Sequence, residues 1–484
     1  MKKMKNYERF ISKESIEKIH EKTLYILENV GIQIEHAEAC ELFKKHGANV
    51  EGHTVKIPEK MVVDALKLAK PKFDLYSSKL EEAIPVGGGS ALVGPASSNI
   101  YMNEDGKIRK MTDEDVINQF KLSDTSAVIS LSNMNFLVDR SNLSSDQKMF
   151  GNLATQLKYS NKCTALARPD MFNVNESEIY KEYTKGLKII KSFEGVEESN
   201  KIVHIGIMST LTPLAIHGGQ IEMALAICKE NQALWLTPCA MPLLTAPGSL
   251  AGMIAVTNAE VLAGYILCKL VNPEVPFIYG NTSGSTDMRT LQLTIGTPET
   301  ALVCYATAGL ADLYNLPFRA GGGLSDAKDF DIQAGIESNM MIQASLDCGA
   351  DFIHHGCGTI GTFNIVSFEK FLLDEEIYMM NKRIYRGIDC EDQNFSMTEI
   401  EKVGPRGSFL KGRTPKSYRQ DFYLSAYLNK DDPNQWQSNG SRSVRDAAKE
   451  GVKKRLESYC PPEISAEQEK LLSRYLPEKY KNKI

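Results

Sequence analysis

The sequence lacks a basic excess, a disulfide framework and a hydrophobic leader. Its 484 residues include 56 Lys and Arg against 61 Asp and Glu, a net charge of -5, which disfavours binding to nucleic acid or to an anionic membrane surface. The first residues, MKKMKNYERF, are charged and do not resemble a signal peptide. The ten cysteines show no paired spacing, so we expect free thiols in a reducing compartment. The sequence therefore predicts a soluble cytoplasmic protein.

Several common catalytic motifs are absent as well. The chain has no Walker loop, no Gly-x-Ser-x-Gly elbow and no His-Glu-x-x-His helix. Gly356-x-Gly358-x-x-Gly361 formally matches a dinucleotide-binding pattern, but it falls late in the chain and no helix is expected to begin directly after it. These motifs therefore identify no reaction.

No uninterrupted hydrophobic run is long enough for a membrane span, which needs ~20 residues. The segment 250–271 is the most apolar, but it contains polar or charged residues at Thr257, Asn258, Glu260 and Lys269. A buried helix explains this segment better.

The sequence does contain a regular alternation of short apolar runs and helical stretches from about residue 128. The runs recur roughly every 30 to 42 residues, which is the length of a βα unit; they lie at 129–136, 163–167, 202–207, 233–236, 276–280, 317–320 and 351–354. One more run after Gly361 gives about eight units in ~260 residues. We therefore predict an α/β fold with a (β/α)8 TIM barrel; a doubly wound open sheet is the competing architecture.

We expect the barrel at 126–390, an N-terminal region of helices and small strands at 1–125, and a C-terminal extension at 391–484. The N-terminal region shows helical patterns ending at Gly31 and Gly47, a strand at 50–57 and a strand that ends in an Asp105-Gly106 turn. The extension is polar. We expect it to form a helix-poor arm and a terminal helical segment that wraps a partner subunit.

Three predicted strand ends are rich in glycine and polar residues, and active sites of barrels lie at these ends. They read Tyr279-Gly280-Asn281-Thr282, Arg319-Ala320-Gly321-Gly322-Gly323-Leu324-Ser325-Asp326 and His354-His355-Gly356-Cys357-Gly358. Glycine lets the backbone approach a ligand or another chain closely. A tight turn is the plain alternative for any one cluster, but three at successive strand ends favour a site.

The histidine pair is the sharpest feature of these clusters. Successive side chains of a strand point to opposite faces, so we expect only one of His354 and His355 to face the barrel axis. A hydrogen-bonded structural role is the usual one for a lone histidine. His355-x-Cys357 is also a spacing found at zinc sites, but no further ligand stands at a convincing spacing, and we expect no bound metal.

Charged and aromatic residues near the same strand ends are further candidates. Arg319 and Asp326 lie close to a strand end, whereas Asp329 and Asp331 suit the N-terminus of the next helix. Aromatic faces attract ammonium groups by about 0.5–2 kcal/mol each. A subset of the aromatic residues could therefore form a cage for a cation, although most should belong to the core: Tyr101, Phe136, Trp235, Tyr279 and Phe352.

Several segments, in the same order, resemble the trimethylamine methyltransferase family over about residues 14–390. They are Ile32-x-Ile34, Gly47-Ala48-x-Val50, Val55-x-Ile57-Pro58, Asn258-Ala259-Glu260-Val261-Leu262-Ala263-Gly264, Leu270-Val271-Asn272-Pro273, Pro276-x-Ile278-Tyr279-Gly280, Met288-Arg289-Thr290, Gly296-Thr297-Pro298-Glu299, Gly323-x-Ser325-Asp326-Ala327-Lys328 and Gln333-Ala334-Gly335. No single segment is diagnostic, but their order makes the resemblance specific.

The resemblance implies a methyltransferase that passes a methyl group from an amine to the cobalt of a corrinoid carried by a separate protein, with no cofactor tightly bound to this chain. The founding members contain pyrrolysine and act on trimethylamine. This sequence contains only the standard residues, which places it with the branch associated with quaternary amines such as glycine betaine, proline betaine, carnitine and γ-butyrobetaine. We also expect a homo-oligomer.

A quaternary amine leaves as a neutral amine, so its demethylation needs no general acid. The protein has mainly to bind the cation, align its methyl group and exclude water. We expect His355 to face the substrate or the corrinoid, and Asp326 to orient a neighbouring group. Arg319, His354 or His355 would bind a carboxylate through a charge-assisted hydrogen bond.

The full predicted site has two further parts. The substrate-binding residues are Tyr101, Phe136, Tyr279, Asn281, Arg319, Phe352 and His354. The glycines expected to allow docking of the corrinoid protein are Gly321, Gly322, Gly323, Gly356 and Gly358.

Two other functions remain open from the sequence. One is a zinc-dependent transfer of methyl from a methylcorrinoid to a thiol, using His355 and Cys357. The other is a non-catalytic betaine-binding subunit, with which the absence of an evident acid–base pair is compatible.

Overall fold

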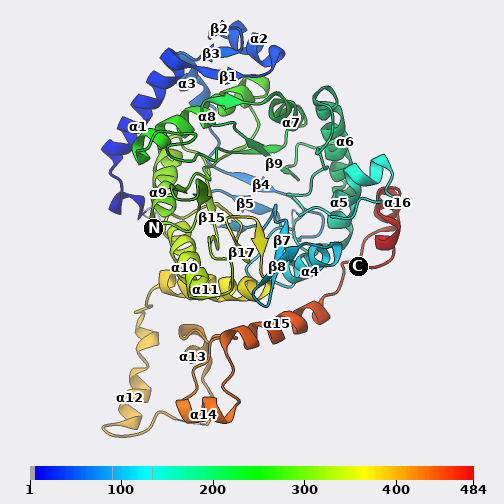
Figure 1. The fold of residues 1–484 in the computed structure, drawn as a ribbon. Coiled ribbons are helices and arrows are strands. Elements are labelled where there is room, and N and C mark those ends of the chain that lie inside the picture. Colours follow the sequence, from blue (N-terminus) through cyan, green and yellow to red (C-terminus); the bar gives the residue numbers. More distant parts are fainter. Residues whose placement is uncertain (1–5, 90, 133–134, 411) are drawn as a thin grey trace.

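The computed structural model describes residues 6–89, 91–132, 135–410 and 412–484. It is an α/β fold in which helices surround several short, mixed sheets (Figure 1). The N-terminal part consists of η1 (Asn6–Arg9), α1 (Lys13–Tyr25), η2 (Ile26–Val30), β1 (Ile32–Ile34), α2 (Ala37–Lys45), β2 (Asn49–Glu51), β3 (Thr54–Lys56), α3 (Glu59–Leu66), β4 (Phe73–Leu75), β5 (Ile84–Val86), β6 (Leu92–Val93), β7 (Tyr101–Glu104), β8 (Lys107–Lys110) and α4 (Asp113–Asp124).

The central part alternates strands and helices: α5 (Ser145–Tyr159), α6 (Glu176–Glu194), β9 (Ile205–Ser209), β10 (Ala215–Ile216), α7 (Gly218–Lys229), β11 (Ala233–Thr237), α8 (Leu250–Val271), β12 (Phe277–Tyr279), β13 (Ser285–Asp287), β14 (Gln292–Thr294), α9 (Pro298–Leu313), β15 (Arg319–Gly321), α10 (Ile332–Asp347), β16 (Phe352–His354), β17 (Thr359–Ile360), β18 (Ile365–Val366) and α11 (Phe368–Arg386). The C-terminal part contains η3 (Asp392–Phe395), α12 (Met397–Val403), α13 (Lys416–Asp421), α14 (Pro433–Ser438), α15 (Val444–Ser458), α16 (Ala466–Ser473) and η4 (Glu478–Tyr480).

Glycines set several boundaries of the N-terminal part, as the sequence predicts. Gly31 has a φ of 88° where η2 ends, and Gly47 has a φ of 104° after α2. The segment 50–57 is not one strand, because Gly52, with a φ of 62°, turns the chain into the hairpin β2–β3. The hairpin β7–β8 turns at Asp105-Gly106, where both residues have positive φ.

Parallel strands occupy the middle of the molecule (Figure 1). β9, β11 and β12 pair in parallel. A parallel bridge between Tyr279 and Phe318 continues the series to β15, which pairs with β16 so that Arg319 lies opposite Phe352. The polar ends of β12, β15 and β16 are therefore neighbours.

The N-terminal part contributes to the same series. On its other edge β16 pairs in parallel with β6. The segment 130–131 lies next to β6 in this series, because the N–H of Ser130 donates to the carbonyl of Val93 at 2.8 Å. A parallel bridge joins Leu131 to the segment 163–165, which receives a 2.9 Å backbone hydrogen bond from β9. Residues 133–134 of the predicted run 129–136 lie outside the described residues.

The strand predicted after Gly361 has a different place. It is β18, which pairs antiparallel with β17 before Gly361 and lies in one sheet with β7 and β8. The turn is tight because Gly361, Thr362 and Phe363 all have positive φ, between 55° and 71°. The position beside β16 is taken by β6, which lies in the predicted N-terminal region, so strand pairing crosses the predicted boundary at residue 125.

One hydrophobic cluster packs between the parallel segments. Side chains of hairpin β4–β5 belong to the same cluster and cover the end of the core where β9 begins. The members are Phe73, Leu75, Val86, Leu92, Leu131, Cys163, Ala165, Leu166, Ile202, Ile205, Ala233, Trp235, Ile278 and Phe352. The centre of the fold is therefore packed rather than hollow.

Helix α8 is the predicted buried helix. It is the one helix in the described part of the chain that is long and apolar enough to cross a membrane, but 83% of its most apolar window is buried. Asn258 on this helix donates to Thr23 at 2.9 Å and to Tyr314 at 2.7 Å. Its apolar composition thus reflects burial between α1, α3, α7 and α9.

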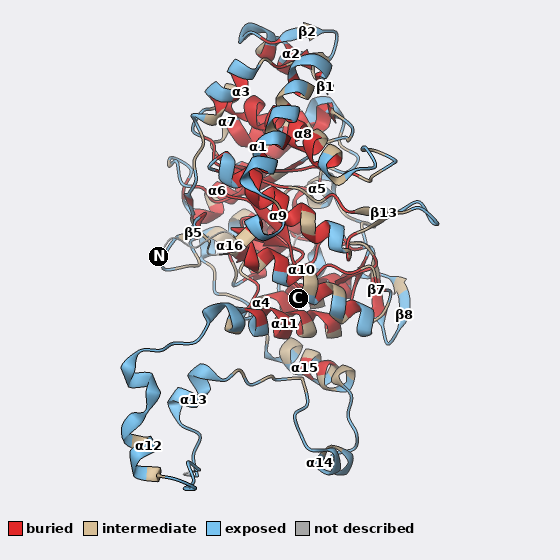
Figure 2. Ribbon diagram, turned by 90° about the vertical axis from the view of Figure 1, so that its left-hand side faces the viewer, coloured by how far each residue is buried: buried red, intermediate tan, exposed pale blue. Residues whose placement is uncertain are grey.

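The C-terminal part first leaves the body and then returns to it. Residues 387–443, which we call the arm, extend from the body with α12, α13 and α14 largely exposed (Figure 2), and residues 420–426 in its middle hydrogen-bond back to α11. Helix α15 packs on α11 and α4, and α16 packs on α5 and α6. The arm is therefore anchored at both ends.

A buried ion pair holds the loops after β15 and β16 against α11. The Lys370 ammonium lies 2.6 Å from the Asp374 carboxylate, and both side chains are fully buried. Lys370 also donates to the Gly323 carbonyl at 2.9 Å, and Asp374 accepts from the Gly358 N–H at 2.7 Å. This pair connects two glycine-rich strand ends.

We predict that Lys370→Met lowers the free energy of unfolding by about 3–5 kcal/mol, because it leaves the Asp374 carboxylate buried without a counterion. Chemical denaturation measures the loss. Lys181→Met, which breaks an exposed pair with Glu178, is the control and should cost less than about 1 kcal/mol. The double change Lys370→Met/Asp374→Leu should recover most of the stability; equal losses in the single and double variants would contradict this explanation.

Candidate active site

Strands β11, β15 and β16 bring four of the polar and aromatic side chains together. The Arg319 guanidinium lies over the Trp235 ring, with its central carbon 5.4 Å from the ring centroid. Trp235 also makes edge contacts with Phe352 at 5.1 Å and with His354 at 5.0 Å. This places three predicted substrate-binding residues around one tryptophan.

The two histidines face each other rather than opposite sides of the strand. The strand alternation fails here because His355 has a φ of 56°, in the left-handed region. The two ring centroids lie 4.1 Å apart. Both rings meet Ser97: its hydroxyl lies 2.8 Å from His354 Nε2, and its backbone N–H donates to His355 Nδ1 at 3.4 Å.

Burial leaves Arg319 charged and the two histidines neutral. Arg319 is 2% exposed, and burial lowers its pKa to about 10, so it stays charged at neutral pH. Burial together with the charge of Arg319 holds the pKa values of His354 and His355 well below the usual range, so both imidazoles are neutral.

The Arg319 charge is only partly satisfied. Its Nη1 donates to the Asn281 carbonyl at 3.3 Å. Its Nε and Nη2 are buried, and neither has a hydrogen-bond partner among the residues that the structure describes. No carboxylate among those described residues forms a salt bridge with Arg319. A buried charge in this state is costly, which points to an anionic ligand.

A small cavity of about 20 Å³ lies beside this guanidinium, with room for about one water molecule. Its lining includes Asn281, Arg319, Gly321, Met341 and Phe363. Phe363 is half-buried, whereas Arg319 is deep in the core. The Phe363 ring also contacts His355, with centroids 4.7 Å apart. The cavity therefore runs from the guanidinium toward an aromatic ring near the surface.

Asp326 fixes the hairpin that carries Phe363. Its carboxylate accepts from the N–H groups of Ile295 and Gly296 at 2.9 and 2.8 Å, and from the Thr362 hydroxyl at 2.7 Å. It thus ties the β17–β18 turn to the loop before α9. These contacts make Asp326 a positioning group in this structure.

Three predicted substrate-binding residues make their contacts with groups other than Arg319 and the histidines. Tyr101 packs on the small cluster around Ile360, in the sheet of β7 and β8. The Tyr279 hydroxyl donates to Asn258 on α8 at 2.7 Å, so its ring faces the helices. Phe136 lies under the Arg168 guanidinium at 5.2 Å. Their binding roles stay predictions.

The glycines at the strand ends allow close backbone packing. A Cβ on Gly322 would lie 2.5 Å from Gly356 Cα, and one on Gly323 would meet the Asp374 carboxylate at the same distance. Gly321 and Gly358 are also buried, against Leu324 and Phe371. Their role in docking a corrinoid protein stays a prediction.

Sequence reasoning did not assign four residues of this site. Trp235 was recognisable only as one aromatic among several near strand ends. Arg168 directly follows the run 163–167, which could have marked it; its Nε is buried without a partner among the described residues, and its charge contributes to the low pKa of His354. Ser97 and Phe363 follow no predicted strand, and nothing in their sequence context singles them out.

The structure offers no support for the zinc alternative. Cys357 is fully buried in the main core, and burial raises its pKa well above the usual value. Across the ranges described, no group of three or more His, Cys, Asp or Glu side chains is arranged to hold a metal ion. His355 and Cys357 therefore do not form part of a ligand cluster.

Comparison with known proteins gives related sequences along the whole chain. The L-carnitine:corrinoid methyltransferase and the proline betaine:corrinoid methyltransferase of Eubacterium limosum are each 34% identical over 477 residues, covering 98% of both chains. The glycine betaine methyltransferase of Desulfitobacterium hafniense is 32% identical over 474 residues, or 97% of each chain.

Among solved structures, the monomethylamine methyltransferase of Methanosarcina barkeri has a TM-score of 0.47 and 12% identity, over 93% of this chain and 88% of that one. The family model described as trimethylamine methyltransferase (MTTB) matches residues 1–483. The chain therefore belongs to the trimethylamine methyltransferase family.

Proposed function

We propose that this protein demethylates a quaternary amine that bears a carboxylate, and transfers the methyl group to the Co(I) corrinoid of a partner protein. The relatives named for carnitine, proline betaine and glycine betaine support this function. The single observation in the site that supports it is the buried Arg319 guanidinium, with two nitrogens that lack partners among the described residues. A small betaine is the class of ligand that fits.

The carboxylate of the substrate would bind Arg319. The two free nitrogens, Nε and Nη2, can donate two hydrogen bonds to a carboxylate, which is the strongest arrangement an arginine makes. A simple cation such as tetramethylammonium would instead be repelled by the uncompensated guanidinium. The charge of Arg319 therefore selects zwitterions.

The ammonium end would lie toward Phe363 and His355. An aromatic face attracts a quaternary nitrogen, and a neutral imidazole does not repel it. The Co(I) corrinoid supplies the nucleophile, and the amine leaves neutral, so no side chain has to donate a proton. We therefore assign His355 to contact with the substrate, and Asp326 to positioning Phe363 through the Thr362 hydrogen bond.

Substrate entry requires the cavity to enlarge, because about 20 Å³ holds no betaine. The β17–β18 turn is the element whose displacement would open it, since Phe363 is the half-buried part of the lining. Closure of this turn over the substrate would then exclude water from the methyl transfer.

We infer that the parallel segments close into a (β/α)8 barrel. The pairings described above support a ring in the order β6, 130–131, 163–165, β9, β11, β12, β15 and β16, with β16 paired again to β6. The shared cluster of inward side chains also supports it. The corrinoid would arrive on its carrier protein, and ten free cysteines are consistent with a cytoplasmic location.

The arm supports a homodimer. Large apolar side chains are exposed along it: Ile388, Phe395, Met397, Ile400, Phe409, Leu410, Tyr418, Phe422 and Leu424. Helices α10 and α11, which pack on each other, also expose large apolar side chains: Ile332, Ile336, Met380 and Ile384. Exposed patches of this kind mark interaction sites.

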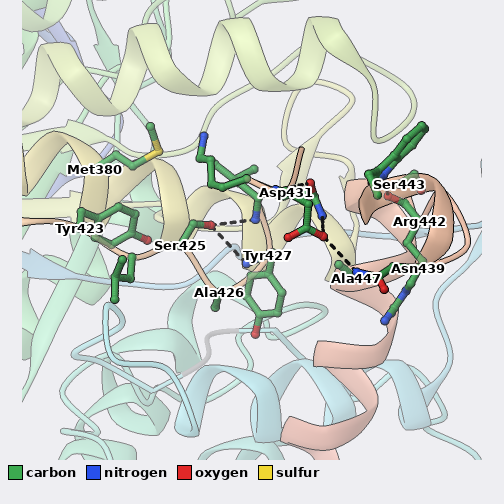
Figure 3. A pocket seen from close by; sticks show the side chains of 15 residues that line it. Met380, Tyr423, Ser425, Ala426, Tyr427, Asp431, Asn439, Arg442, Ser443 and Ala447 are labelled. Atoms are coloured by element: carbon green, nitrogen blue, oxygen red, sulfur yellow. Dashed lines mark hydrogen bonds between the residues drawn. The ribbon is translucent and has the colours of Figure 1, made fainter. Parts of the chain in front are cut away.

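A groove of about 600 Å³ lies between α11, the arm and α15, and its lining includes Met380, Tyr427 and Arg442 (Figure 3). Because one chain carries both an apolar arm and an apolar surface, two copies related by a twofold axis can each cover the other. We therefore assign the arm to contact with a second copy of this chain.

The substrate assignment predicts a specific pattern of activity. With a reduced corrinoid protein, wild type should methylate cobalt from glycine betaine, proline betaine or carnitine, but not from trimethylamine or tetramethylammonium; absorbance of the methyl-cobalt product measures this. Arg319→Gln should lower kcat/KM for the betaine by about 30- to 1000-fold, the effect of removing one partner of a buried charge pair. Arg319→Lys keeps the positive charge but loses the planar pair of donor nitrogens, so its kcat/KM should lie between those of wild type and Arg319→Gln.

Two outcomes would contradict this proposal. If no quaternary amine yields methyl-cobalt although betaine binds, the chain is a binding subunit. If Arg319→Gln keeps its preference for carboxylate-bearing substrates, another residue binds the carboxylate.

The buried neutral histidines predict how stability depends on pH. Burial lowers the pKa of His204 to about 3, and those of His354 and His355 also lie well below their unfolded value, near 6.5. The unfolded chain therefore binds more protons below about pH 6.5, so the free energy of unfolding should fall as the pH drops from 7 to 5. Thermal unfolding measures this slope.

In this experiment His355→Asn should reduce the loss of unfolding free energy between pH 7 and 5, whereas His46→Asn, at an exposed position, should leave that loss unchanged. The rate of methyl transfer should stay level between pH 6.5 and 8, because the site imidazoles remain neutral. A rate that rises or falls with a single titration in that range would show instead that an imidazole proton takes part.

The arm predicts the oligomeric state. Wild type should sediment as a dimer or a larger even-numbered oligomer, because a second copy would bury the exposed apolar side chains of the arm. Ile400→Asp/Leu410→Asp should produce monomers, since charges on both sides of the arm cannot be buried at the interface. Leu68→Asp, at an exposed position on the body, is the matched control. A monomeric wild type, or an unchanged double variant, would contradict the assignment.

A further inference from the structure

Three neighbouring loops carry exposed apolar side chains on the side of the molecule where the active-site strands end. They follow β9, β11 and β12, and comprise residues 209–215, 237–249 and 281–297. The exposed side chains are Leu211, Leu243, Leu244, Met288 and Leu291, with exposed fractions between 46% and 63%. We call these five residues the apolar rim.

The rim is also unusually poor in charge. Charged residues make up 24% of the whole chain, but loops 209–215 and 237–249 contain none. In the third loop, Asp287 and Arg289 neutralise each other in a 2.6 Å ion pair. Depletion of charge beside exposed apolar residues is typical of the centre of a protein–protein interface.

These loops are held in place by the body and by one another. The buried Glu260 carboxylate on α8 accepts from Thr210, from the Thr212 hydroxyl at 2.9 Å and from the Leu214 N–H at 2.8 Å. The Thr286 hydroxyl donates to the Pro242 carbonyl at 2.8 Å, which joins the second loop to the third. A surface fixed in advance loses little entropy when a partner binds.

The position of the rim determines what can reach the active site. Hairpin β4–β5 covers one end of the central core, and β5 and β13 lie on opposite sides of the molecule (Figure 2). The C-terminal ends of β12, β15 and β16, with Arg319 and the histidines, are on the side of the rim because the strands are parallel. A carrier that brings cobalt to the substrate must therefore approach over these loops.

We propose that the apolar rim is the docking surface for the corrinoid protein. Its partner would be the face of that protein around the exposed corrin ring, which has to be apolar and weakly charged to match the rim. This inference rests on the proposed methyl transfer. Unlike the glycines at the strand ends, these side chains are accessible on the surface.

The test compares two methyl acceptors for the same enzyme. Leu243→Glu/Leu291→Glu should raise the KM for a corrinoid protein that wild type methylates by at least tenfold, and leave the rate with free cob(I)alamin and the affinity for the betaine, measured by calorimetry, within twofold of wild type. Leu243→Asn/Leu291→Asn, which removes apolar area without adding charge, should show a smaller increase in KM. Val63→Glu, at an exposed position on α3, should change none of these values.

A KM for the corrinoid protein within twofold of wild type in the Glu double variant would overturn the docking surface. Equal losses with the corrinoid protein and with free cob(I)alamin would also overturn it, because the loops would then act on the active site. A change from dimer to monomer in sedimentation would assign the rim to a second copy instead. Failure of the proposed function is separate: wild type itself would then methylate neither acceptor.

Discussion

A buried positive charge that forms no salt bridge with any described residue is the constraint on which the site depends. Arg319 lies on a central strand, its guanidinium rests on the Trp235 ring, and only one of its nitrogens has a partner among the described residues. Such a group destabilises the free protein, and an anion that enters the cavity relieves that cost. Burial, with a smaller contribution from this charge, holds the pKa values of the two neighbouring histidines well below the usual range, so both stay neutral. Burial of the site thus bears both on ligand selection and on protonation.

The geometry around this charge depends on close packing of backbone. Gly322 and Gly356 let β15 and β16 continue side by side beyond their paired residues. The left-handed conformation of His355 then turns its ring back toward His354 and Ser97. Farther out, Asp326 joins two loops and holds the turn that carries Phe363. The site is rigid at the guanidinium and connected to the surface through one turn.

The sequence predicted the parts of the fold that follow from local signals. The spacing of apolar runs located β9, β11, β12, β15 and β16, because each strand is buried and bounded by glycine, proline or polar residues. It did not locate β6, since Leu92-Val93 is too short to form a recognisable run, and its place in the series depends on pairing with β16. The run after Gly361 was assigned to that place instead, although three successive residues with positive φ make it a hairpin.

The same distinction applies to the site. Arg319 and the histidines were identifiable because they stand directly at strand ends. Tyr279 stands at a strand end too, but its side chain faces α8, and a difference of one residue in strand register decides that direction. Ser97 and Phe363 reach the histidines from loops distant in sequence, and only the folded chain brings them there.

Hairpin β4–β5 has a kinetic consequence. Because its side chains pack into the core at the end opposite Arg319, the amine and the cobalt carrier would both approach from the side where the parallel strands end. A carrier that binds before the amine would then hinder entry of the amine. A high concentration of the carrier would therefore slow the reaction.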